Sequence, residues 1–355
     1  MIIVYTRLLQ IMIRLIDTVA FLLVVLTVYA ITPHQSPTNQ QKRELWVNNN
    51  NSDNNNTLHD QYFPNSQLVL DMATISHAVY RFKWNKFTSC HDINSGTLHN
   101  ETYPIRLPNH TECLYYTHDE SLGTQVLVLR SSVYNYVSVA YAGTDDWKTA
   151  LADGDIFMSD FGPSSLNNST TNITAEEKQK EDDIRSLFKN VSTDVRVHRG
   201  FNNNVFANSS EFVKLLNCID SARLGGDCEN TSPDDIINSI ESPYELITTG
   251  HSLGAASSVL LGAALHLLYP TETIRTINYG CPKIGNSEWG SYINSRQPNQ
   301  EKGSGSLEIF RFVNKIDLVP RLPELPLLVH VGHTLQMSVG GVIRVSVCML
   351  NVYTY

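Results

Sequence analysis

The pentapeptide Gly-His-Ser-Leu-Gly at positions 250–254 constrains the fold of this chain more than any other stretch of it. By itself a Gly-x-Ser-x-Gly match is weak, because roughly one chain in ten of this length and composition carries one by chance. Its context makes it specific. Residues 244–249 read as a strand and residues 253–269 as an apolar helix that ends at Pro270. We therefore predict a sharp strand–turn–helix that presents the Ser252 hydroxyl at the edge of a sheet.

This turn has a chemical meaning. The start of the following helix directs its free amides and the positive end of its dipole toward negative charge developing next to Ser252. Ser252 is therefore the candidate nucleophile, and the N–H of Leu253 is a candidate oxyanion donor. A bare glycine-rich turn is the alternative interpretation of the same five residues.

The rest of the chain predicts an α/β fold. Apolar residues at helical spacing begin a helix near Leu68, and β-rich runs at 125–130, 133–142, 244–249, 273–279 and 307–313 alternate with helical stretches. One of these helices is expected around residues 203–218. Residues 154–192 read as a polar surface insertion with a helix over 175–188. The alternation predicts a mostly parallel sheet covered by helices.

The predicted domain begins at residue 67. Residues 1–32 carry Arg7 and Arg14 followed by an apolar run of signal-peptide length, so they are expected to be a cleaved signal peptide or an uncleaved signal anchor. Residues 33–66 are rich in asparagine and predict a linker. Residues 67–338 are expected to form the α/β domain, and residues 339–355 are a tail that matches no pattern of that domain.

Cysteines and glycosylation motifs support the secretory pathway. Cys90 with Cys113, and Cys218 with Cys228, form two short-range pairs that predict disulfides in an oxidising compartment; free or buried thiols are the alternative. Ten Asn-x-Ser/Thr sequons precede Ser252 and predict a glycoprotein, although several are expected by chance in a chain rich in asparagine.

Charge and motif content limit the partners. The net charge of −9 argues against a nucleic-acid partner, because no basic stripe can displace phosphate counterions. It also disfavours electrostatic attraction to anionic lipid, so contact with a lipid–water interface would rest on apolar residues. The sequence shows no metal-ligand motif, and we expect neither a metal nor a cofactor.

Beyond these patterns, the chain resembles the fungal-type, class 3 triacylglycerol lipases, which have the α/β-hydrolase fold. The resemblance rests on five blocks whose order and spacing match the family pattern: 142–144 with Trp147, 197–201, 250–254, 279–286 and 314–323. It implies a serine hydrolase whose substrate is an acylglycerol or another lipid ester, reached at a lipid–water interface.

The resemblance also implies roles for individual residues. Thr144 would supply the second oxyanion-hole N–H; a Gly-Thr turn with Asp145 capping a helix is the alternative. Trp147 would belong to a lid, or else is a core aromatic residue. His198 and His251 would be structural, and Gly280 would shape a tight turn close to the nucleophile.

The acidic member of the catalytic triad is expected at Asp317. This residue follows the predicted strand 307–313, and the chain order serine then aspartate agrees with α/β-hydrolases. Glu308 and Asp220 are rivals, but neither lies just past the carboxyl end of a strand.

The base is the open question. Only His330 and His333 follow Asp317, and their block resembles an earlier, non-catalytic histidine block of the family. Either one of them, with His330 as our candidate, has been recruited as the base, or the C-terminal part is truncated and the true base is absent.

Three functional expectations follow. The first is an acylglycerol lipase that works through an acyl-enzyme on Ser252. The second is a phospholipase, galactolipase or feruloyl-type esterase with the same catalytic residues. The third is a lipid-binding relative without catalysis, which the insecure base favours.

Overall fold

The structure is a computed structural model. It describes residues 46–48, 62–64, 66–84, 89–94, 107–119, 123–143, 157–163, 175–228, 244–298, 305–314, 316–323, 328–337 and 344–347. The α-helices are α2 Ser66–Trp84, α3 Cys90–Asn94, α5 Ala175–Phe188, α6 Arg199–Phe206, α7 Ser209–Arg223, α8 Leu253–Leu268 and α9 Ser287–Asn294. The strands are β1 Trp46–Asn48, β2 Tyr62–Pro64, β3 Glu112–Asp119, β4 Thr124–Ser131, β5 Tyr136–Tyr141, β6 Met158–Asp160, β7 Arg196–His198, β8 Glu245–His251, β9 Ile274–Tyr279, β10 Leu307–Asn314, β11 His333–Met337 and β12 Arg344–Val347.

Eight strands form one sheet in the order β12-β11-β10-β9-β8-β5-β4-β3. Strands β5, β8, β9, β10 and β11 run parallel, whereas β3 and β4 at one edge and β12 at the other pair antiparallel. The predicted mostly parallel sheet is confirmed. Neighbouring parallel strands have their carboxyl ends on the same side of the sheet, which we call its carboxyl edge. The segments after β5, β8, β9 and β10 are therefore brought together there.

Both faces of the sheet are buried, and the alternation of side chains along each strand shows why. In β4, Val126 and Val128 pack into one apolar cluster, whereas Leu127 and Leu129 pack into a second cluster on the opposite face. A strand that is buried on both sides reads as a continuous apolar run, which is how β4 appears in the sequence.

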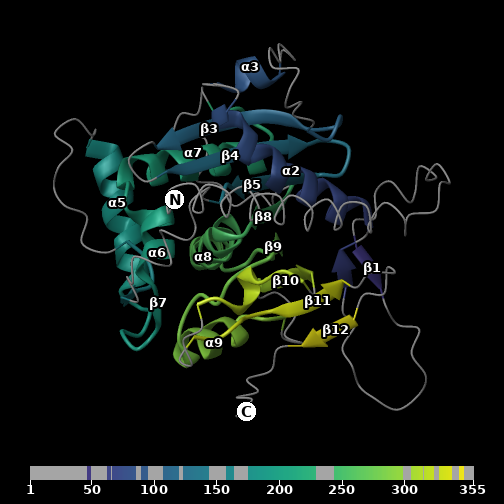
Figure 1. Ribbon diagram of the computed structural model, residues 1–355. Helices are drawn as coiled ribbons and strands as arrows, with labels where there is room; N and C mark the ends of the chain where they lie inside the picture. Colours follow the sequence, from purple (N-terminus) through teal and green to yellow (C-terminus); the bar gives the residue numbers. More distant parts are fainter. Residues whose placement is uncertain are drawn as a thin grey trace, which may run out of the picture.

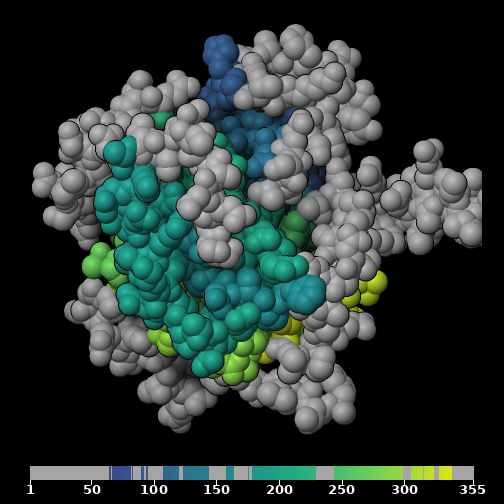
Figure 2. All heavy atoms as spheres, turned by 90° about the vertical axis from the view of Figure 1, so that its left-hand side faces the viewer, coloured from purple at the N-terminus to yellow at the C-terminus, as the bar shows by residue number. Residues whose placement is uncertain are grey.

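Helices cover the two faces unequally (Figure 1). The predicted helix near Leu68 is α2, and it packs Leu68, Met72 and Ile75 onto one face of the sheet. Helices α5 to α8 lie on the other face, and α5, α6 and α7 form a broad part of its outer surface (Figure 2). In α8 every residue from Leu253 to Leu265 is buried, because this helix lies between the sheet and α6.

The helical region before β8 differs from the prediction. The single helix expected around residues 203–218 is two helices, α6 and α7, which are separated at Ala207 and Asn208. The Asn208 side chain accepts a hydrogen bond from the N–H of Glu211 and thereby begins α7. The helix predicted over 175–188 has the bounds of α5.

The segments expected to be a linker and a tail both contain strands. Strands β1 and β2 pair antiparallel inside the segment expected to be a linker, and β12, in the expected tail, pairs with β11. The signal segment 1–32 lies outside the described residues. Among the residues that are described, no helix combines the length and apolar character needed to cross a bilayer.

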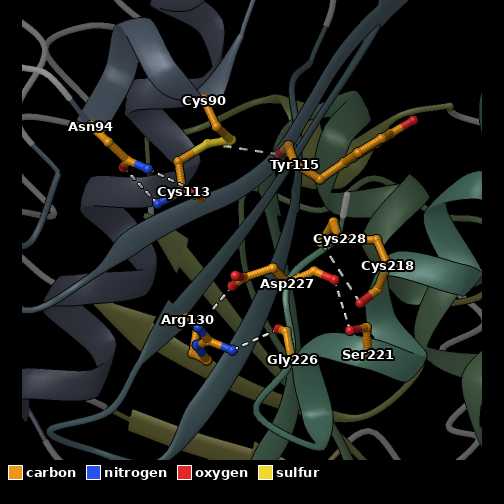
Figure 3. Close-up of a disulfide and its surroundings, with 10 residues drawn as sticks. All are labelled: Cys90, Asn94, Cys113, Tyr115, Arg130, Cys218, Ser221, Gly226, Asp227 and Cys228. Atoms are coloured by element: carbon orange, nitrogen blue, oxygen red, sulfur yellow. Dashed lines mark hydrogen bonds and ion pairs between the residues drawn. A yellow bond between two sulfur atoms is a disulfide. The ribbon is translucent and has the colours of Figure 1, made fainter. Parts of the chain in front are cut away.

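Both predicted disulfides form. Cys90 on α3 is bonded to Cys113 on β3, and Asn94 adds a reciprocal pair of 2.9 Å hydrogen bonds to the Cys113 backbone (Figure 3). Cys218 on α7 is bonded to Cys228 in the loop that follows. These covalent links attach peripheral segments to the sheet and to α7.

Arg130 of β4 fixes the loop that carries Cys228. Its guanidinium donates to the Gly226 carbonyl at 2.7 Å and lies 3.4 Å from the Asp227 carboxylate (Figure 3). The Asp227 carbonyl in turn accepts from the Ser221 hydroxyl at 2.8 Å. The loop is therefore held by hydrogen bonds as well as by its disulfide.

Candidate active site

Ser252 occupies the turn between β8 and α8. Its φ of 57° and ψ of −122° lie in a region that non-glycine residues rarely adopt. The turn is held from both sides: the Ser252 N–H donates to the Tyr279 carbonyl, and its carbonyl accepts from the Ala255 N–H, each at 3.0 Å. The Ser252 hydroxyl does not cap α8. This is the strained turn expected for a nucleophile elbow.

The two motif glycines are required by close backbone approach. A Cβ on Gly250 would overlap the Gly254 carbonyl, and a Cβ on Gly254 would overlap the backbone of Tyr141 and Ala142 at the end of β5. The first turn of α8 is therefore seated directly on β5. This contact brings Gly143 next to the elbow.

Leu253 is the first residue of α8 and is buried. The first amides of a helix have no partner within the helix, and the helix dipole makes this end favourable for negative charge. The Leu253 N–H is thus placed where an oxyanion donor is expected. Thr144 and Trp147, the other residues expected on this side, lie outside the described residues.

His251 is fixed by Tyr80 of α2. The Tyr80 hydroxyl donates to the His251 carbonyl at 2.8 Å and lies 3.1 Å from its Nδ1. Burial lowers the pKa of His251 to about 4, so the ring is neutral at pH 7. This environment agrees with the structural role that we expected for His251.

Asp317 lies just beyond the end of β10, at the same edge of the sheet as Ser252. Its Oδ1 accepts from the Val319 N–H at 2.9 Å. Its Oδ2 faces Gly280, which follows β9 and has a φ of 60°. Burial raises the pKa of Asp317, and the Val319 N–H partly offsets this effect.

The structure does not bring His330 into hydrogen-bond contact with Ser252 or Asp317, both of which it describes. Instead, His330 Nε2 lies 2.7 Å from the Pro320 carbonyl, which can only accept, so Nε2 carries the proton. Burial and the charge of Arg311 lower the pKa of His330 well below its usual range. The ring is therefore neutral, and its lone pair is on the buried Nδ1.

His333 lies at the start of β11, and its ring stacks on Phe310 of β10 with centroids 5.6 Å apart. Burial lowers the pKa of His333. Glu308 and Asp220, the alternative candidates for the acidic residue, form ion pairs elsewhere. Glu308 pairs with Arg275, and Asp220 pairs with Lys180.

A different serine, histidine and aspartate lie in contact at the opposite edge of the sheet. His110 Nδ1 lies 3.0 Å from the Ser131 hydroxyl, and its Nε2 lies 3.1 Å from the Asp71 carboxylate. Ser131 is fully buried and its hydroxyl also accepts from the Tyr134 N–H. No substrate can reach this hydroxyl, so the cluster is a structural contact between α2 and the β4–β5 turn.

Taken together, the central sheet and the serine turn at its carboxyl edge define an α/β-hydrolase. Residues 143–326, more than half of the chain, match the family described as lipase (class 3). The chain belongs to the class 3 lipase family.

Individual relatives align over shorter stretches. A secreted mono- and diacylglycerol lipase A of Penicillium cyclopium is 36% identical over 107 residues, which is 28% of this chain and 31% of the relative. A triacylglycerol lipase of Ricinus communis is 35% identical over 83 residues, 22% of this chain and 15% of the relative. The matched part thus spans about a third of the first relative's length, and less of the second's.

Solved structures share the fold over a longer range. Lipase II from Rhizopus niveus aligns with a TM-score of 0.52 at 20% identity and covers 79% of this chain and 83% of its own. A lipase from Rhizopus microsporus var. chinensis aligns with a TM-score of 0.52 at 18% identity, over 79% of this chain and 77% of its own. At these identities the likeness concerns the fold.

Sequence reasoning missed Tyr80. Its helical spacing from Ser76 and Met72 places it on the buried stripe of α2, which was the signal available. The sequence did not indicate that this stripe ends at the elbow.

Proposed function

We propose that this protein is a serine hydrolase of carboxylic esters that acts on acylglycerols through an acyl-enzyme on Ser252. The observation that carries the proposal is the strained backbone of Ser252 between β8 and α8, with φ of 57° in a non-glycine residue. A strained residue of this kind persists only where the surrounding structure holds it, and such residues cluster at functional sites.

The proposed reaction begins with attack of the Ser252 oxygen on the acyl carbon of the ester. The carbonyl oxygen becomes negative and is stabilised by the N–H groups of Leu253 and Thr144. A histidine oriented by Asp317 takes the serine proton and passes it to the leaving alcohol. Water then attacks the acyl-enzyme, releases the fatty acid and regenerates the Ser252 hydroxyl.

His330 is our candidate for that histidine. In the described arrangement its Nε2 proton is bound by Pro320, so the role requires the ring to move and release this hydrogen bond. His333 is the alternative within the chain. The same observation on His330 favours a second candidate function, a class 3 lipase-like protein that binds lipid without hydrolysing it.

Acylglycerols are the proposed substrates because both curated relatives are described as acylglycerol lipases. We also propose export from the cell, because the N-terminal segment resembles a signal peptide, the chain forms two disulfides and the Penicillium relative is described as secreted. Asn109 and Asn190 are exposed sequon residues and are the proposed glycosylation sites among those described. A mass shift on enzymatic deglycosylation of the exported chain tests this.

A fluorophosphonate probe tests the enzymatic proposal, because it reacts preferentially with an activated serine. We expect labelling of Ser252, identified by peptide mass spectrometry, and its loss in Ser252→Ala. Ser131→Ala is the matched control, since it alters the buried serine–histidine–aspartate cluster and should retain labelling. Loss of labelling in His330→Ala but not in His333→Ala assigns the base to His330.

The substrate class is tested by titrating the fatty acid released from emulsified triacylglycerol, monoacylglycerol and phosphatidylcholine. We expect release from the acylglycerols. Faster release from phosphatidylcholine would assign a phospholipase instead. An unlabelled Ser252 together with binding to neutral lipid vesicles would support the non-catalytic function.

A further inference from the structure

Helix α2 is joined to β8, which leads into the elbow, and to the neighbouring strand β9 by a line of hydrogen bonds. The Val69 carbonyl accepts from the Tyr279 hydroxyl at 2.5 Å, and the Ser76 hydroxyl lies 2.8 Å from the Thr249 hydroxyl. One turn further along, Tyr80 reaches His251. Residues 69, 76 and 80 lie on one face of the helix. This line runs along the sheet and ends at the residue that precedes Ser252.

The Tyr80 hydroxyl also lies against Gly143, which follows β5. A Cβ on Gly143 would overlap this hydroxyl and would lie 2.9 Å from the His251 carbonyl. Gly143 therefore leaves space that the Tyr80 hydroxyl fills. One hydroxyl thus contacts the last residue of β8 and the residue that follows Ala142 beyond β5.

Both contacts concern the turn that carries Ser252. Gly143 precedes Thr144, and the His251 peptide is joined through Ser252 to Leu253. Gly143 and His251 come from different strand ends, so the position of the Ser252 turn depends on how the ends of β5 and β8 are held at this edge. A displacement of about 1 Å in a catalytic group can slow a reaction about a hundredfold.

We propose that Tyr80 is a positioning residue of the turn that carries the nucleophile Ser252. Its hydroxyl holds the His251 carbonyl and lies against Gly143, and in this way it fixes the backbone that presents Ser252 and the Leu253 N–H. The role rests on the proposed serine hydrolase function. Tyr80 acts through the backbone, and it takes part in no proton transfer.

The test compares Tyr80→Phe with Tyr136→Phe in the full chain. Both substitutions keep the ring and remove a hydroxyl that links α2 with the sheet, because Tyr136 donates to Asp71 of α2 at 3.3 Å. Tyr136 begins β5, at the edge of the sheet opposite Ser252. The measurements are the second-order rate constant for fluorophosphonate labelling of Ser252, kcat and KM for a short-chain p-nitrophenyl ester, and Tm.

We expect Tyr80→Phe to lower the labelling rate constant and kcat by about ten- to a hundredfold with KM little changed. Tyr136→Phe should lower Tm at least as much and leave both rates within about twofold of the unmodified chain. Equal labelling rates in Tyr80→Phe and Tyr136→Phe would overturn the positioning role. If the unmodified chain is not labelled, the proposed function fails and the inference fails with it.

Gly143→Ala provides a second variant should Tyr80→Phe not fold. The added methyl group pushes on the Tyr80 hydroxyl from β5 and leaves the tyrosine in the sequence. We expect the same selective fall in labelling rate and kcat. A Gly143→Ala chain that folds and reacts at the unmodified rate would contradict the inference.

Discussion

Oδ2 of Asp317 lies 2.6 Å from the position that a Cβ on Gly280 would occupy. Gly280 follows β9, and its N–H donates to the Phe312 carbonyl of β10 at 2.9 Å. The Asp317 carboxylate, which is proposed to orient the base, is thus packed against the backbone of Gly280, a residue that has no side chain. This relationship makes Gly280 a sensitive position for the proposed activity.

Gly280→Ala should destabilise the fold by about 1 to 2 kcal/mol through its left-handed backbone alone and should also displace the Asp317 carboxylate. Gly123→Ala is the matched control, because Gly123 has a φ of 65° and open space around its Cβ position. We expect similar backbone costs in denaturant titrations, and a fall in ester hydrolysis only in Gly280→Ala. Full activity in a folded Gly280→Ala chain would show that the Asp317 position is not critical.

Asp317→Asn should stabilise the fold at neutral pH while it reduces hydrolysis. Burial raises the pKa of Asp317, so its negative charge is disfavoured in the folded state. The unfolded state releases this proton first, and stability is lost as pH rises from the unfolded pKa of about 4 through the raised folded value. The difference in unfolding free energy between the two chains should therefore grow with pH over this window. A difference that shrinks with rising pH would contradict the prediction.

His251 should make the protein less stable in acid. Burial lowers its pKa to about 4, below an unfolded value of about 6.5. Between these two values the unfolded state binds more protons, so stability is complete above about pH 6.5 and is lost as pH falls toward 4. The shift corresponds to about 3 kcal/mol. Comparing the unfolding free energies of the unmodified chain and of His251→Asn between pH 7 and 4 isolates the contribution of His251. Parallel pH profiles of the two chains would refute the prediction.

Loss of the Cys90–Cys113 disulfide should cost about 3 kcal/mol, because the unfolded chain regains the freedom of the loop that the bond closes. The sequence separation is 23 residues here and 10 for Cys218–Cys228, so the first pair should contribute more. Double alanine variants of each pair, compared by chemical denaturation, measure both contributions. Cys281→Ala controls for removal of a buried thiol that forms no disulfide. A larger loss for the shorter loop would count against the chain-entropy explanation.

Local patterns were enough to predict the strands and helices around Ser252, because β8, α8, β9 and β10 have strong apolar patterns and clear ends. The two cysteine pairs were also readable, since each is close in sequence. By contrast, α9 was not anticipated. It has only eight residues, and its start depends on the Asn286 side chain accepting from the Trp289 N–H. The break between α6 and α7 depends on a similar cap, which apolar periodicity does not reveal.

The sequence by itself determined the α/β class, the serine turn and the order of Ser252 and Asp317, since these follow from short-range patterns and chain order. Only the tertiary structure showed that the Tyr80 hydroxyl lies against His251 and Gly143, 171 and 63 positions away in the chain. The binding of His330 to Pro320 was likewise visible only in three dimensions. Such contacts depend on how the strands are registered and how α2 is packed on them, and the spacing of residues along the chain does not encode that arrangement in any local pattern.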